Sequence, residues 1–151
     1  MKSWNEIDGN KLFNIVFSRP IAIGEIELFS VTLENDQPKI TLQFDIPETP
    51  DSPPSKWGKF NRCRLGLYCL SVRNLKISNI PCKNNLFMRI SYSNNSFTIT
   101  AANANASIEF QAEFVSLSGP SVYLCEVDFK HTNERQPENS HLPIEQENKA
   151  K

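Results

Sequence analysis

The sequence predicts a mostly β fold: an antiparallel β-sandwich or a strongly curved sheet, with one short N-terminal helix. Two observations support this prediction. Between residues 25 and 129, apolar and polar residues alternate over many short segments that turn-forming residues separate. Apolar residues recur at helical spacing only near the N-terminus. A chain of 151 residues is long enough for one domain with its own core, and we place that domain at residues 1–130.

The helix is the first expected element, over residues 11–18. Asp8 or Asn10 can cap its N-terminus, and Pro20 ends it because proline cannot continue helical hydrogen bonding. We expect the helix to cover one edge or open end of the sheet. Its apolar residues are Leu12, Phe13, Val16 and Phe17.

A β-hairpin follows the helix. Residues 25–34 change the face that carries their apolar side chains, which indicates a β-bulge near Leu28. Residues 39–46 alternate without a break, and the turn at residues 35–38 joins the two strands. The apolar residues of the second strand are Ile40, Leu42, Phe44 and Ile46.

Residues 47–59 contain four prolines and are expected to form a long loop, since proline lacks the amide hydrogen that a sheet needs. Trp57 and Phe60 close this loop and should attach it to the body of the domain. Further strands are expected at residues 65–77, 86–92, 97–101, 108–114 and 123–129. The first changes phase near Leu70, and Gly119-Pro120 is expected to turn the chain before the last.

Beyond residue 130 the composition changes to mainly Glu, Asn, Gln, Pro and Lys. We expect residues 131–151 to form a disordered polar tail. Both histidines, His131 and His141, lie there. The body therefore offers no Ser–His or Cys–His pair, and its isolated glycines form no phosphate-binding loop. We expect no enzyme activity, no metal ion and no cofactor.

The cysteines fit a cytoplasmic protein. Cys63 and Cys69 lie six residues apart on one strand, about 20 Å, which is too far for a disulfide. Folding could bring Cys82 and Cys125 together, but nothing in their spacing predicts it, so free thiols are expected. The polar N-terminus has no signal-peptide character. No apolar run approaches the roughly 20 residues of a membrane span, so we expect a cytoplasmic protein without membrane contact.

Charge is distributed unevenly. No acidic residue occurs between Asp51 and Glu109, whereas eight basic residues do. These bases either pair with acids on neighbouring strands or form a patch for an acidic partner. If they form a patch, the surface consists of Lys56, Trp57, Lys59, Arg62 and Arg64.

Carboxylate pairs at even spacing suggest a second surface, because alternate residues of a strand share a face. This alternative acidic face consists of Glu25, Glu27, Glu126 and Asp128. Such pairs could also build a carboxylate-based hydrolase, usually across two strands that line a cleft. A solvated sheet face is the simpler interpretation.

Three stretches, in this order, resemble bacterial polymorphic-toxin immunity proteins, and in particular the immunity protein 50 family. They are Trp4 with Ile7-Asp8-Gly9 and the helix up to Phe17 and Pro20, the run Leu67 to Ile77, and the run Ala106 to Ala112. The resemblance covers about residues 4–129.

The resemblance implies a cytoplasmic antidote, as in contact-dependent inhibition, that binds a cognate secreted toxin domain and blocks it by occlusion. Such a protein needs no catalytic residues but a preformed, charged and partly aromatic surface, commonly about 800 Å² per partner. The alternative is a nucleic-acid-binding or ligand-binding accessory domain, and the net charge of −1 disfavours nucleic acid. The sequence gives neither the activity of the toxin nor the oligomeric state.

Overall fold

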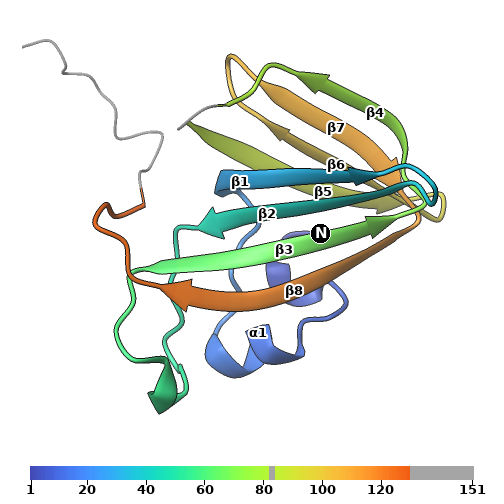
Figure 1. Ribbon diagram of the computed structural model, residues 1–151. Helices are drawn as coiled ribbons and strands as arrows, with labels where there is room; N and C mark the ends of the chain where they lie inside the picture. The colour runs from blue at the N-terminus through green and yellow to red at the C-terminus, as the bar shows by residue number, and fades with distance from the viewer. Residues whose placement is uncertain (82–83, 130–151) are drawn as a thin grey trace, which may run out of the picture.

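The computed structural model describes residues 1–81 and 84–129. Within them, one eight-stranded antiparallel sheet has the strand order β4-β7-β6-β5-β1-β2-β3-β8 (Figure 1). The strands are β1 (Glu25–Glu34), β2 (Lys39–Ile46), β3 (Arg62–Leu70), β4 (Arg73–Ser78), β5 (Asn85–Ser93), β6 (Ser96–Ala102), β7 (Ser107–Ala112) and β8 (Phe114–Tyr123). The helical elements are η1 (Trp4–Glu6), α1 (Lys11–Val16) and η2 (Ser55–Trp57). The predicted fold class is confirmed.

The sheet bends into two four-stranded halves because the strands at its centre pair only briefly. β1 and β5 pair over three residues, Glu25–Glu27 against Asn85–Phe87. Away from this pairing, the chain passes between the halves at two short connections, from β3 to β4 and from β7 to β8. The inner faces of both halves therefore contribute to a single apolar core.

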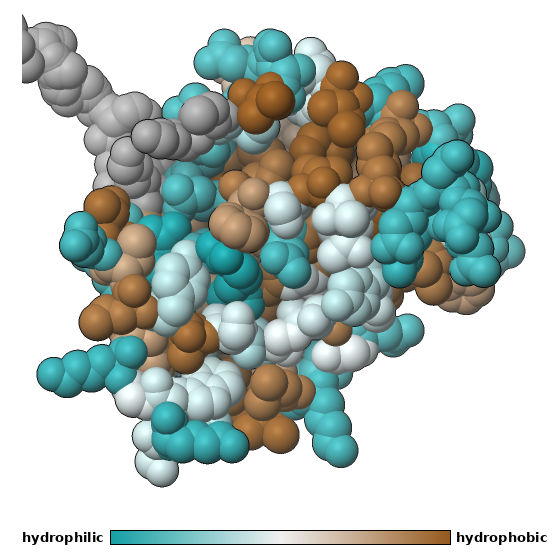
Figure 2. All heavy atoms as spheres, viewed as in Figure 1, coloured by the Kyte–Doolittle hydropathy of each residue, from teal (hydrophilic) through white to brown (hydrophobic). Residues whose placement is uncertain are grey.

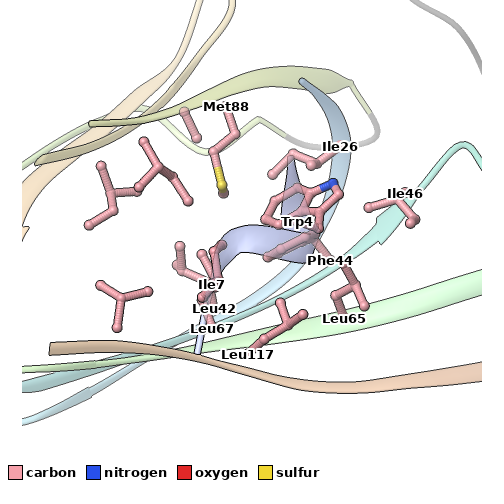
Figure 3. Packing of buried hydrophobic residues seen from close by; sticks show 14 of the residues in the cluster. Trp4, Ile7, Ile26, Leu42, Phe44, Ile46, Leu65, Leu67, Met88 and Leu117 are labelled. Carbon is pink, nitrogen blue, oxygen red and sulfur yellow. The ribbon is translucent and has the colours of Figure 1, made fainter. Parts of the chain in front are cut away.

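The N-terminal segment, residues 1–24 before β1, fills the space between the two halves. The ring of Trp4 lies 5.2 Å from that of Phe44 on β2. Figure 3 shows Trp4 and Ile7 between Met88 on one side and Leu117 on the other. All five side chains are at most 5% exposed, and burying each one stabilises the fold by about 1.5–3 kcal/mol.

The hairpin prediction is confirmed, since β1 pairs with β2 and the register shifts between Leu28 and Ser30. The helix is shorter than expected and ends at Val16. Asn10 is its N-terminal flanking residue but makes no capping hydrogen bond. Its side-chain amide donates instead to the carbonyl oxygen of Asn5.

The expectation of one strand over residues 65–77 was wrong. Ser71 adopts a positive φ of 54°, which interrupts the extended backbone. β3 therefore ends at Leu70, and β4 pairs with β7 at the far edge of the sheet.

The expectation that Gly119-Pro120 turns the chain was also wrong. β8 continues through this cis peptide. Ser118 still pairs with Gly66 and Ser121 with Arg64, because a bulge absorbs the irregularity. The strand predicted at residues 123–129 does not form beyond Tyr123.

Cys63, Cys69 and Cys125 are free thiols, and Cys82 lies outside the described residues. Burial raises the pKa of the Cys63 and Cys69 thiols to about 12, so both remain protonated at neutral pH. In the described part of the chain, no helix has the length and apolar character needed to cross a membrane. The tail predicted at residues 131–151, with both histidines, also falls outside the described residues.

Gly9 and Gly58 provide a matched test of how the N-terminal segment is held. Their φ values are 83° and 65°, so alanine costs about 1–3 kcal/mol at either position. A Cβ at Gly9 would also lie 2.5 Å from the carbonyl oxygen of Leu117, whereas at Gly58 it would meet nothing within 4 Å. We expect Gly9→Ala to lower the free energy of unfolding more than Gly58→Ala in urea titrations. Equal losses would show that close packing of Gly9 on β8 is unimportant.

Candidate partner-binding site

The predicted basic residues lie at one end of the β1-β2-β3-β8 half, around the proline-rich loop that contains η2 (Figure 1). Lys56 and Lys59 are exposed. Trp57 is partly buried and packs against the core. Arg62 is only 7% exposed, and Arg64 is intermediate. The loop therefore presents its lysines to solvent, while the arginines lie on the sheet.

Arg62 and Arg64 share one buried carboxylate. Their side chains leave the outer face of β3 beside Asp45 of β2, which is 1% exposed. The Nε of Arg62 donates to one oxygen of Asp45 at 3.0 Å, and the Nε of Arg64 donates to the other at 2.8 Å. Both oxygens are thus compensated by positive charge, as a buried carboxylate requires.

Two further residues extend this cluster. Glu27 of β1 forms an ion pair with Arg62. The hydroxyl of Tyr123 of β8 accepts a hydrogen bond from Arg64 at 2.9 Å and donates one to Asp45. Burial lowers the pKa of Arg62, but the negative groups around it outweigh this effect and raise it overall. We call Glu27, Asp45, Arg62, Arg64 and Tyr123 the Asp45 network.

An aromatic ring covers part of the Asp45 network. The β-bulge of β1 leaves Phe29 without a partner in the register. The centre of its ring lies 4.0 Å from the guanidinium carbon of Arg64. Phe29 is nevertheless 62% exposed. The bulge therefore places an apolar ring on the surface and a cation against it, a contact worth about 0.5–1 kcal/mol.

The acidic candidates adjoin the basic ones. Glu27 pairs with Arg62, and Asp128 accepts a hydrogen bond from the side chain of Asn61 at 2.7 Å. Glu25 accepts one from Asn85 at 2.7 Å, near the start of β1. Glu126 is exposed. The structure therefore brings two of the four acidic candidates, Glu27 and Asp128, to the start of β3, whereas Glu25 contacts β5.

Charge pairing accounts for the two arginines but not for the two lysines. Among residues 1–81 and 84–129, neither Lys56 nor Lys59 forms an ion pair. Sequence reasoning missed Asp45 and Tyr123 as parts of the site. The strict alternation of residues 39–46 already placed Asp45 on the polar face, but its partners depend on the register between β2 and β3.

The charged side chains of the Asp45 network hold one another in place across four strands. Within the described residues, no group of three or more His, Cys, Asp or Glu could hold a metal ion. The family model described as Immunity protein 50 matches residues 9–123.

The chain belongs to the immunity protein 50 family. The resemblance seen in the sequence is thereby confirmed. The matched span includes all eight strands and every residue of the Asp45 network. No curated protein and no solved structure matches this family member.

Asp45→Asn tests whether the shared carboxylate stabilises the fold. The amide removes the charge that compensates two guanidinium groups, one of them buried, and we expect a loss of about 2–3 kcal/mol. The control is Glu34→Gln, which breaks the exposed pair with Lys39 and should cost less than about 1 kcal/mol. Urea unfolding measures both, and similar small losses would contradict the prediction.

Tyr123 gives the network a signature at alkaline pH. Burial raises the pKa of Tyr123 to about 12, and its hydrogen bond to Asp45 acts in the same direction; an unfolded tyrosine titrates near pH 10. The protonated hydroxyl therefore contributes its full stabilisation below about pH 10. This stabilisation is lost as the pH rises towards 12. In a tyrosinate absorbance titration we expect a step near pH 12 that is absent in Tyr123→Phe. Complete titration near pH 10, with the fold intact by circular dichroism, would contradict this assignment.

Proposed function

We propose that this family member binds a cognate secreted bacterial toxin domain in the cytoplasm and neutralises it, without catalysis, by occluding the active surface of the toxin. Membership of the immunity protein 50 family is the observation that carries the proposal. The exposed lysines and the exposed ring of Phe29 support it, because a charged and partly aromatic surface is what docking of a protein partner requires.

The proline-rich loop is held in place before any partner arrives. The amide of Ser52 donates to the carbonyl oxygen of Val16 at 2.9 Å. Asp51 accepts hydrogen bonds from the backbone amide and the hydroxyl of Ser18, and these bonds lower the pKa of Asp51. Trp57 packs against the core at the other end of the loop. A preformed loop loses little conformational entropy on binding.

We assign different roles to the basic residues within this surface. Lys56 and Lys59 are exposed and attract an acidic toxin surface, which accelerates capture. Arg64, whose guanidinium stacks on Phe29, provides a contact to the toxin near the start of β3. Arg62 is mostly buried and supports the surface by fixing Asp45 and Glu27.

The double variant Lys56→Glu/Lys59→Glu tests the loop surface. We expect it to weaken binding about tenfold or more, mainly through slower association, because it replaces attraction by repulsion. Surface plasmon resonance against a candidate toxin domain, sought in the reading frame immediately upstream, measures both rates. The control is Lys2→Glu/Lys11→Glu, which makes the same charge change at exposed positions of the N-terminal segment.

Unchanged affinity of the loop variant would remove the loop from the interface. Weaker binding by Glu126→Lys/Asp128→Lys instead would move the interface to the acidic face. If the wild-type chain does not bind the toxin and does not protect cells that express it, the proposed function is wrong. Salt-sensitive oligonucleotide binding without the toxin would then favour the accessory-domain alternative.

A further inference from the structure

The two edges of the sheet are protected to different degrees. At the β8 edge, the amide of Leu117 donates to the carbonyl oxygen of Asp8 at 2.7 Å, and Asp8 forms a parallel bridge with Ser116. Pro120 and the adjacent bulge interrupt the remainder of that edge. Prolines and bulges are common means of preventing an edge strand from pairing further. The β8 edge is therefore closed to another strand.

The β4 edge has much less protection. Among the described residues, β4 pairs only with β7, so its second row of backbone groups faces outwards. A bulge affects the beginning of β4, but the register is regular from Lys76 to Ser78. β4 therefore offers a short, regular stretch of free strand edge.

Apolar side chains lie along this free edge. Ile77 stands opposite Ile108 of β7, yet Ile108 is 3% exposed and Ile77 is 48% exposed. Leu75 also packs partly against the core. Figure 2 shows hydrophobic residues gathered over β4. An additional strand beside β4 would widen the sheet by one strand, and its side chains would cover Ile77.

A second copy of this chain does not fit the edge well. An antiparallel pair of β4 strands that places Leu75 opposite Ile77 also places Lys76 directly opposite Lys76 of the other copy. Like charges at directly opposed positions destabilise a sheet. The edge instead favours a strand with apolar residues opposite Leu75 and Ile77 and an acidic residue opposite Lys76.

We propose that the free edge of β4 accepts an extended segment of the toxin as a ninth strand, and that this segment carries Asp or Glu between two apolar residues. The inference rests on the proposed function and names a second contact with the same partner. Backbone hydrogen bonds provide the affinity of such strand addition, and alternate side chains provide its specificity. Because β4 and the proline-rich loop lie at opposite corners of the molecule (Figure 1), their contributions can be measured separately.

Two single variants test the side chains of the edge. Ile77→Asp places a charge on the apolar face, and we expect it to weaken toxin binding about tenfold or more. Lys76→Gln removes the charge that attracts an acidic partner residue without placing a like charge opposite Glu109 of β7, and we expect it to weaken binding about threefold to fivefold. The controls are Ile15→Asp and Lys11→Gln on α1, since Ile15 is 61% exposed and Lys11 is also exposed. Isothermal titration calorimetry gives the affinities, and thermal unfolding confirms that each variant is folded.

Hydrogen exchange tests the backbone. On toxin binding, we expect the amides of residues 75–78 that point away from β7 to exchange at least tenfold more slowly, because strand addition gives acceptors to these amides. Weaker binding of the variants without this protection would replace strand addition by a side-chain contact and overturn the inference. If the wild-type chain binds the toxin but the β4 variants bind equally well and the amides are unchanged, the inference is wrong and the proposed function stands. If the wild-type chain does not bind, both are wrong.

Discussion

The hydrogen bonds to the carboxylate of Asp45 hold together the charged surface around the start of β3. The carboxylate accepts hydrogen bonds from Arg62, Arg64 and Tyr123, so it connects β2 to β3 and β8. Arg62 extends the connection to Glu27 of β1. A buried charge is tolerated only where opposite charge and hydrogen bonds compensate it. The positions of these side chains on four adjacent strands are therefore interdependent.

The bend of the sheet determines which surfaces remain free. β1 pairs with β5 over three residues only, so the two halves separate along most of their length and form a core between them. The N-terminal segment closes one side of this core and one edge strand, β8. β4 at the other edge is not covered by any described residue in this way. The same topology thus protects one edge and exposes the other.

Local sequence signals predicted the parts of the fold that local chemistry controls. The alternation of residues 39–46 and the phase change near Leu28 gave the hairpin and its bulge. The later strands were placed less well. A phase change near Leu70 indicates one irregular strand, whereas a positive φ at Ser71 ends β3 there. Gly119-Pro120 has the composition of a turn, but pairing with β3 on both sides keeps it within β8.

By itself, the sequence determined the β class, the family resemblance and the location of the basic residues in the chain, because these follow from composition, periodicity and short motifs. Only the tertiary structure decided which charges are paired. Asp45 lies 17 residues before Arg62, and no spacing rule connects them. Their contact depends on the register between β2 and β3, which the packing of the core faces sets. The exposed edge of β4 likewise follows from the order of the strands in the sheet, which local patterns do not encode.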